Sequence, residues 1–348
     1  MGADRSIAVY GAGAVGCYLG GQLSWGGESE VTLIGRTPLV EAVQSHGLTI
    51  REDGAERVSH PRATTSIAGL PACDLAILAV RAYDVERSIP ELAALMGESG
   101  LCLAVQNGVG SEEQLAGALD RRRVLVGTLT ARTDVEAPGV VARASRGGGV
   151  ALASMDGSPV PRWIVDAFRA AWLPTMVLLD YRSLRWSKLL LSMLGAAQTA
   201  ILDVDLAAVV GNPALFRLEQ LAFREAGRVM DAQRIPTAAL PGYPVPLARL
   251  AMRLPRSLAR RLLRGRLAGS RGGRAPTMRA DVARGRSEIA YLNGAVAREG
   301  GRLGVRTPVN RGLADLVEEL VAHPGRRDTF RGRPDALLAF MAGRGIRV

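Results

Sequence analysis

The sequence has few of the side chains that enzymes most often use for proton transfer and metal binding. Its three histidines stand in no motif with an acidic partner; they are His46, His60 and His323. A His–Asp acid/base pair and a histidine-based zinc site are therefore not expected. Its three cysteines lie far apart without metal-ligand spacing; they are Cys17, Cys73 and Cys102. We expect buried, reduced thiols, no metal, and some other group to handle the proton.

Long apolar runs are also missing. No stretch approaches the ~20 uninterrupted apolar residues of a membrane span, and a strand-like run begins too early to leave room for a signal peptide. We therefore expect a cytoplasmic protein without a membrane span. Its length of 348 residues predicts two domains or one large one. The sequence leaves the oligomeric state open, with a homodimer as one option.

Aromatic residues make up only 4% of the chain, and no nucleic-acid-binding module can be recognised. The net charge is +11, but the basic residues are spread along the chain apart from one late cluster. We therefore expect no nucleic-acid partner. Anionic small molecules explain part of the charge.

The clearest motif lies at the N-terminus. The apolar run 6–10 leads into Gly11-Ala12-Gly13-Ala14-Val15-Gly16, and a helix-like run follows at 17–23. A strand, G-x-G-x-x-G and a helix are the order that a dinucleotide fold needs. The first glycine permits the tight turn, the second lets the backbone approach a pyrophosphate, and the third lets helix and strand pack closely. The alternative is a structural glycine turn.

The next strand indicates which dinucleotide is bound. Val31–Ile34 is followed by Gly35-Arg36, with no acid before Glu41. An NAD site usually places Asp or Glu here to hold the ribose 2′-hydroxyl. An arginine fork suits a 2′-phosphate instead. We therefore predict NADPH over NADH, the alternative for Arg36 being a solvated surface charge.

Further apolar runs predict more strands, and two of them end at candidate ligand contacts. The run 73–80 precedes Arg81, which is either an anion contact or a surface charge. The run 101–105 precedes Gln106-Asn107-Gly108-Val109-Gly110, in which Asn107 is a site candidate or a turn residue, and Ser111 is a plausible helix N-cap. Strands are also expected at 124–128, 138–141, 149–152 and 175–179. We therefore predict an α/β Rossmann-type domain over residues 1–180.

From Tyr181 onward the pattern becomes helical, which predicts an all-α domain over 181–348. Long helices are expected at 184–201, 216–233 and 277–297, with another running to 321 behind a cap at Asn310 or a neighbour. The Pro- and Arg-rich stretch at about 241–274 is either a helical hairpin or a basic surface element. A membrane-surface or nucleic-acid contact there is the less favoured alternative.

One lysine heads the apolar helix 184–201. Lys188 is followed by three leucines. It either extends its ammonium group to water or is partly desolvated, with a lowered pKa, and serves as a proton donor.

Several stretches together resemble the ketopantoate reductase family (2-dehydropantoate 2-reductases). They are the glycine motif with Arg36, the Gln106–Gly110 stretch, Pro138-Gly139-Val140-Val141, Trp186-Ser187-Lys188-Leu189, and Ser287-Glu288-Ile289-Ala290-Tyr291-Leu292-Asn293-Gly294. The resemblance covers nearly the whole chain. It implies an NADPH-binding α/β domain joined to an all-helical domain, with the substrate between them.

The resemblance also implies roles for single residues. In that family, the lysine that matches Lys188 protonates the ketone oxygen as hydride arrives, and the glutamate that matches Glu288 binds the resulting hydroxyl. The asparagine that matches Asn107 positions the cofactor and the lysine. The residue that matches Thr277 lies where the family holds the substrate carboxylate.

The chain departs from the family at three positions. Ser192 and Ala196 stand where the family usually has asparagines, and Arg81 stands where it commonly has a lysine. We keep Ser192 as a substrate contact and Arg81 as a cofactor contact. The lost amide groups put the substrate in doubt, because they remove specific hydrogen bonds.

The expected function is NADPH-dependent reduction of a 2-oxo acid to a 2-hydroxy acid. The leading substrate is 2-dehydropantoate, with a related, less polar ketone close behind. The alternatives are an opine- or imine-reducing enzyme and a non-catalytic NADP-sensing protein whose segment Arg249–Arg274 binds an anionic partner.

Overall fold

The chain divides into two compact units, each described here by itself. The structure is a computed structural model that describes residues 5–27, 29–145, 147–269 and 277–348, except for the side chains of 263–269 and 277. The α/β unit comprises Met1–Gln106, Gly110–Arg185 and Leu240–Tyr243. The helical unit comprises Asn107–Val109, Trp186–Ala239 and Pro244–Val348.

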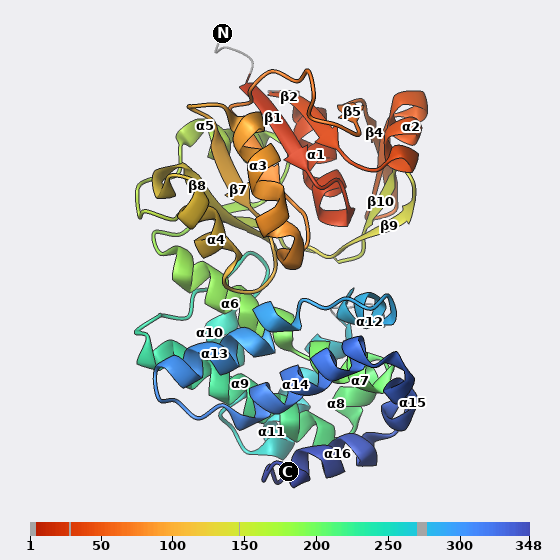
Figure 1. The fold of residues 1–348 in the computed structure, drawn as a ribbon, viewed down its shortest axis with the longest axis vertical. Helices are drawn as coiled ribbons and strands as arrows, with labels where there is room; N and C mark the ends of the chain where they lie inside the picture. The colour runs from red at the N-terminus through yellow and green to blue at the C-terminus, as the bar shows by residue number, and fades with distance from the viewer. Residues whose placement is uncertain (1–4, 28, 146, 270–276) are drawn as a thin grey trace. The chain divides into compact units, whose positions relative to one another are not determined.

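An eight-stranded sheet forms the centre of the α/β unit (Figure 1), in the order β12-β11-β8-β7-β6-β1-β2-β5. Its strands are β1 (Arg5–Tyr10), β2 (Ser29–Ile34), β5 (Arg62–Thr64), β6 (Leu75–Leu78), β7 (Leu101–Ala104), β8 (Val124–Leu129), β11 (Val150–Ser154) and β12 (Thr175–Val177). Six strands, from β5 to β8, pair in parallel, and β11 is antiparallel to β8. In chain order the parallel strands run 3-2-1-4-5-6, the doubly wound order of dinucleotide-binding folds. The predicted Rossmann-type fold is confirmed.

The strand order reverses beside β1, which pairs in parallel with both β2 and β6. Tyr10 lies opposite Ile34 on one side and opposite Leu78 on the other. The carboxyl ends of these three strands therefore lie at one edge of the sheet. Ligands of open α/β sheets bind at such a switch point.

A second, four-stranded sheet in the order β4-β3-β10-β9 was only partly predicted. Its strands are β3 (Leu48–Glu52), β4 (Ala55–Ser59), β9 (Thr133–Ala137) and β10 (Val140–Arg143). The alternating apolar pattern around Leu48 and Ile50, followed by the polar run 51–54, predicts the β3–β4 hairpin, and the structure contains it. The parallel pairing of β3 with β10 was not foreseen, because it joins segments far apart in sequence.

Helices cover the large sheet (Figure 1). They include α1 (Ala14–Gly26), α3 (Val85–Met96), α4 (Ser111–Ala118) and α5 (Arg162–Ala170), while α2 (Thr37–His46) follows β2. Apolar side chains of α1 and α5, such as Leu19 and Phe168, share one core with the strands. Helix α4 has Gly110 at its N-cap, so the prediction of Ser111 as the cap was wrong by one residue.

All three cysteines are buried and free, which confirms the expectation of structural thiols. Burial raises the pKa of Cys17 to about 12 and that of Cys73 to about 11. Such thiols stay protonated and unreactive near neutral pH.

A buried arginine joins several elements of the α/β unit. Arg185 lies in α6 (Tyr181–Met193) and is 1% exposed. Its guanidinium donates to the carbonyl oxygens of Ala104, Gln106 and Gly127, at 2.9 Å for Ala104 and 3.2 Å for Gly127. Its Nε lies 3.4 Å from the carboxylate of Glu112, which is also 1% exposed. The carboxyl end of β7, strand β8 and helix α4 are thus fixed by one charged group.

The helical unit contains the rest of the helices. They are α7 (Ala196–Leu202), α8 (Leu206–Gly211), α9 (Pro213–Ala232), α10 (Val245–Ala251), α11 (Arg256–Gly269), α12 (Thr277–Ala283), α13 (Asn293–Arg302), α14 (Pro308–Ala322), α15 (Arg327–Phe330) and α16 (Pro334–Gly343). The prediction of a helical second part is confirmed. Among the described residues, no helix is both long and apolar enough to cross a membrane.

The prediction of a single helix over 184–201 is wrong, because the helix is interrupted at Gly195, between α6 and α7. This glycine has φ of +71°, and an added Cβ would lie 2.2 Å from Leu206. Its N–H donates at 2.8 Å to the buried carboxylate of Glu219, which also accepts from Gln198 at 2.7 Å. Glu219 thus satisfies the start of α7, which lacks intrahelical partners.

The single helix predicted over 277–297 is also wrong. Helix α12 ends at Ala283, and the chain turns through Gly285, whose φ is +73°. A 3₁₀ turn, η3 (Ile289–Tyr291), precedes α13. Glu288 therefore lies at the N-cap of a tight turn and not in the middle of a helix.

Helix α14 begins at Pro308 with Thr307 as its N-cap, so Asn310 does not cap it. Asn310 is buried and donates to the carboxylate of Glu225 on α9 at 2.8 Å. That carboxylate also accepts from the backbone N–H groups of Val309 and Asn310. It therefore satisfies the start of α14 from another helix.

Loss of Arg185 should destabilise the α/β unit. We expect Arg185→Met to lower the free energy of unfolding by about 3–5 kcal/mol, because Glu112 and the carbonyl groups would stay buried without their donor. The measurement is urea unfolding followed by circular dichroism. The double variant Arg185→Met/Glu112→Leu should recover part of the loss, because it removes both charges.

Arg162→Met is the matched control, because this side chain is 94% exposed. Its effect should stay within about 0.5 kcal/mol. Equal effects of the two arginine substitutions would contradict the structural role of Arg185.

Candidate functional site

The glycine motif forms the turn between β1 and α1. Gly11 has φ of +94°, and an added Cβ there would lie 2.8 Å from the backbone nitrogen of Val80, just after β6. A Cβ on Gly16 would lie 2.6 Å from the carbonyl oxygen of Gly11. Both glycines are therefore required by close packing within the protein.

Gly13 is different, because an added Cβ there would meet nothing within 4 Å. It is exposed and is the N-cap residue of α1, before the helical residues Ala14 and Val15. The first N–H groups of a helix have no intrahelical partners and attract anions. The turn thus leaves open space in front of helix α1, where a pyrophosphate would need it.

Arg36 lies beside this turn. It is the exposed N-cap residue of α2 and follows β2 directly. The backbone N–H groups of Gly11 and Ala12 both donate to the carbonyl oxygen of Ile34, at 3.1 and 3.0 Å. The end of β2 and the glycine turn are therefore in direct contact. The carbonyl oxygen of Arg36 accepts from the N–H groups of Leu39 and Val40, but its guanidinium forms no hydrogen bond or ion pair with the part of the chain that the structure describes.

Arg81 is placed at the same edge by β6. It is half-buried, follows Val80, and is the N-cap residue of the 3₁₀ turn η1 (Ala82–Asp84). Since Val80 is the residue that Gly11 packs against, Arg81 is next in sequence to a contact of the glycine turn.

Sequence reasoning missed the residue that holds this edge together. Gln106 is buried, and its amide donates to the carbonyl oxygens of Leu78 at 2.6 Å and Val80 at 3.3 Å. The backbone carbonyl oxygen of Gln106 accepts from the guanidinium of Arg185. Gln106 therefore connects the end of β7 to the end of β6. Its place in the motif 106–110 was visible in the sequence, but its role was not.

The segment Asn107–Val109 belongs to the helical unit, where it packs against the turn that carries Glu288. The N–H of Val109 donates to the carbonyl oxygen of Tyr291 at 2.9 Å, and the N–H of Tyr291 donates to the backbone carbonyl oxygen of Glu288 at 3.0 Å. Gly108 has φ of +93°, and an added Cβ would lie 2.4 Å from the Tyr291 carbonyl oxygen. The structure thus brings together the segments of two predicted site residues, half-buried Asn107 and buried Glu288.

Lys188 lies on a narrow accessible strip of a buried segment. Between residues 183 and 202, only Lys188, Leu191 and Ser192 are not buried. Their i, i+3, i+4 spacing in α6 places them on one face of the helix. Ser187 fixes this part of α6, because its hydroxyl accepts from the N–H of Ala238 at 2.8 Å. Ala196 is buried beyond the helix break and is not part of the strip.

The sequence holds one further signal that the motif search overlooked. The chain has 44 basic residues of the lysine and arginine types, and Lys188 is its only lysine. Arginine keeps its proton at any pH that proteins experience, whereas lysine can release it. Of these 44 side chains, the one able to donate a proton is thus the one on the accessible strip of α6.

Thr277 is the first residue of α12, but its side chain lies outside the described residues. Among the described side chains, no three His, Cys, Asp or Glu residues gather as a metal site would require.

Comparison with known proteins extends these observations to the whole chain. Residues 7–157 match the family model "Ketopantoate reductase PanE/ApbA", and residues 180–321 match "Ketopantoate reductase PanE/ApbA C terminal". The 2-dehydropantoate 2-reductase of Halobacterium salinarum is 31% identical over 319 residues, which cover 89% of this chain and 97% of that protein.

Solved structures show the same likeness. A PanE/ApbA family ketopantoate reductase from Ralstonia eutropha JMP134 is 27% identical, with a TM-score of 0.76, and the match covers 91% of this chain and 100% of that one. A D-mandelate dehydrogenase solved with NADH and anilino(oxo)acetate is 23% identical, with a TM-score of 0.77 and coverage of 91% and 98%. At that identity the second likeness concerns the fold alone. The chain belongs to the ketopantoate reductase family and is an oxidoreductase acting on a C=O or CH–OH group.

Proposed function

We propose that this protein reduces a 2-oxo acid to a 2-hydroxy acid with NADPH, and that 2-dehydropantoate is its leading substrate. The observation that carries the proposal is Lys188, the only lysine of the chain, on the only accessible strip of the segment 183–202. Membership of the ketopantoate reductase family supports the substrate class.

Lys188 supplies the proton of this reaction. When a carbonyl carbon accepts a hydride, its oxygen becomes negative and must take up a proton. An ammonium group at that oxygen stabilises the developing charge and can transfer the proton, and water then reprotonates the neutral amine. An arginine could stabilise the charge but could not give up its proton. The balanced reaction consumes one 2-oxo acid, one NADPH and one proton.

The glycine turn fits a dinucleotide. A nicotinamide cofactor supplies the hydride when it is bound. The space that a Cβ on Gly13 would fill is free, and the N–H groups of the first turn of α1 are available for a pyrophosphate. The residues proposed to hold the cofactor are Gly11, Ala12, Gly13, Ala14, Val15, Gly16, Arg36, Arg81 and Asn107.

Arg36 accounts for the preference for NADPH. It stands after β2, where NAD-binding folds usually place the acid that holds the ribose 2′-hydroxyl. Its exposed guanidinium suits a 2′-phosphate, and the start of α2 behind it adds a favourable helix dipole.

The helical unit contributes the remaining contacts. Glu288 is 6% exposed, and its carboxylate is proposed to accept a hydrogen bond from the product hydroxyl. Asn107 orients the ligands from the segment packed against the Glu288 turn. Ser192, one helical turn after Lys188, and Thr277 are proposed substrate contacts. A serine reaches less far than the asparagine of the family, so a hydrogen bond to the substrate is lost and less polar 2-oxo acids become competing substrates.

The proposal is tested by NADPH oxidation, followed by absorbance, with a panel of 2-oxo acids that includes 2-dehydropantoate and less polar analogues. Lys188→Ala should lower turnover by about 10²–10⁴-fold, because the proton donor is lost. Its affinity for NADPH should not change. Lys188→Arg should remain close to the alanine variant, since the guanidinium keeps the charge but not the transferable proton.

Added methylammonium should partly restore the activity of Lys188→Ala, as expected for a missing amine. Full activity of Lys188→Arg would contradict proton donation by this residue. Turnover that required an added amino acid would favour an imine-reducing enzyme instead. An absence of turnover with every substrate would leave only an NADP-binding protein.

Arg36→Ala should weaken the binding of NADPH and leave the binding of NADH unchanged. We expect KM for NADPH to rise about 10–100-fold, because a charge-assisted contact to the 2′-phosphate is lost. KM for NADH should stay unchanged. Arg162→Ala, at an exposed site on α5, is the matched control. Equal use of NADH and NADPH by the unmodified protein would refute the assignment to Arg36.

Gly13→Ala should separate cofactor binding from folding. The added methyl group meets no protein atom within 4 Å, so thermal stability should be retained. NADPH affinity, measured by fluorescence titration, should fall about tenfold or more, because the methyl group occupies the space for the pyrophosphate. Gly16→Ala should instead destabilise the protein, because its Cβ would lie 2.6 Å from a carbonyl oxygen. Unchanged NADPH affinity of Gly13→Ala would contradict the proposed cradle.

A further inference from the structure

Two adjoining cavities on the helical unit are lined by arginines that the proposed reaction does not use. The first has a volume of about 180 Å³ and is lined by Phe223, Arg224, Gly227, Arg228, Asp231, Arg249 and Arg253. The second, of about 510 Å³, is lined by Arg217, Arg224, Arg253, Pro255 and Arg256. Because they share Arg224 and Arg253, we treat them as one feature, the arginine pocket.

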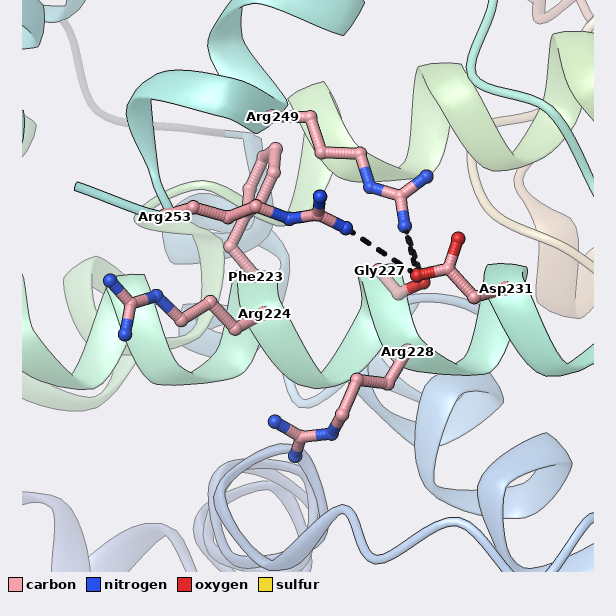
Figure 2. Close-up of a pocket in the computed structure, with 7 residues that line it drawn as sticks. All are labelled: Phe223, Arg224, Gly227, Arg228, Asp231, Arg249 and Arg253. Carbon is pink, nitrogen blue, oxygen red and sulfur yellow. Dashed lines mark hydrogen bonds and ion pairs between the residues drawn. The ribbon is translucent and has the colours of Figure 1, made fainter.

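Positive charge in the arginine pocket is poorly compensated. Six arginines line it, and Asp231 is the only acidic residue among the lining residues. Figure 2 shows Arg249 and Arg253 converging on Asp231, at 2.6 and 3.5 Å, while Arg224 and Arg228 point away from it. The second cavity has no acidic lining residue at all.

Hydrogen bonds to the backbone hold part of the pocket in place. Arg224 on α9 donates to the carbonyl oxygens of Met252 and Leu254, at 2.7 and 2.9 Å, in the turn between α10 and α11. Gln220 donates to the same two oxygens and accepts from Arg217 at 2.8 Å. These bonds fix two guanidinium groups before any ligand arrives, which lowers the entropic cost of binding.

Arginines of the pocket still have N–H groups that could donate to a ligand. A guanidinium has five N–H groups, and Arg224 uses two of them on the backbone. Arg256 is exposed, and its guanidinium makes no hydrogen bond or ion pair with the described residues. Burial lowers the pKa of Arg224, and the nearby charges of Arg217 and Arg228 lower it further. Like charges are thus held together without a sufficient counter-charge.

We infer that the arginine pocket binds the phosphate groups of a phosphate-bearing ligand. Guanidinium forks match phosphate oxygens in pairs, and several forks around one open cavity suit a ligand with more than one phosphate. A single carboxylate would leave most of this charge unpaired. The inference is independent of the proposed reaction, because none of the lining residues is assigned to the cofactor or the substrate.

The phosphate groups could belong to a free molecule or to lipid headgroups. Exposed leucines occur on both neighbouring helices, Leu247 and Leu250 on α10 and Leu258 and Leu262 on α11. A lipid surface would use them together with the arginines, whereas a free polyphosphate would not. The test therefore has one arm for each source.

The first arm is calorimetric titration of the full-length protein with inorganic tripolyphosphate. Arg217→Ala/Arg256→Ala should weaken its binding at least about tenfold, because two charged donors are lost. The affinity for NADPH should be unchanged, which excludes binding of tripolyphosphate at the glycine turn as the cause. Arg87→Ala/Arg162→Ala removes the same charge from exposed sites elsewhere and should leave both affinities unaltered.

The second arm measures sedimentation with vesicles that contain phosphatidylglycerol, against vesicles of phosphatidylcholine alone. Binding to the anionic vesicles that is lost in Arg217→Ala/Arg256→Ala and weakened in Leu250→Ser/Leu258→Ser would assign the phosphate groups to lipid headgroups. Absence of binding in both arms would overturn the inference. Binding that survives in Arg217→Ala/Arg256→Ala, or falls equally in the control variant, would overturn it as well.

Discussion

The α/β unit depends on one constraint, the need to satisfy a guanidinium buried away from water. An unpaired charge at the position of Arg185 would cost several kcal/mol, so its partners cannot move independently. Through Gln106, its hydrogen bonds reach the carbonyl groups of Leu78 and Val80, and Val80 in turn packs on Gly11. The geometry of the glycine turn therefore rests on a charge that lies well outside the motif.

Local signals in the sequence were sufficient for much of the fold and insufficient for its breaks. The β1–glycine turn–α1 unit is encoded in consecutive residues, so it could be predicted. The breaks at Gly195 and Gly285 could not, because the apolar pattern continues through both and glycine is tolerated in helices. What decides them is non-local, as with Glu219, which caps α7 from the neighbouring helix α9. The pairing of β3 with β10 escaped prediction for the same reason.

In the candidate site too, local signals in the sequence predicted some features, and contacts between distant segments decided the others. Residue types at strand and helix ends were enough to single out Arg36, Asn107 and Lys188, whereas only the family resemblance singled out Glu288. Their surroundings could not be predicted, because Gly108 packs on Tyr291, far along the chain, and only that contact shows why a glycine follows Asn107. The structural role of Arg185 could not be predicted from its place in a helix, because its partner Glu112 and its carbonyl acceptors lie in distant segments.

The near-absence of lysine separates two kinds of chemistry that cationic residues usually share. Of the lysine and arginine residues of this chain, all but Lys188 are arginines. Arginines can bind anions, whereas only the lysine can also donate a proton. An arginine cluster can hold phosphate or carboxylate groups, but it cannot act as a general acid, because its protons are not released. The arginine pocket on α9–α11 is therefore suited to binding and not to a second reaction. By the same reasoning, a basic proton donor in this chain, other than a histidine or the N-terminus, can only be Lys188.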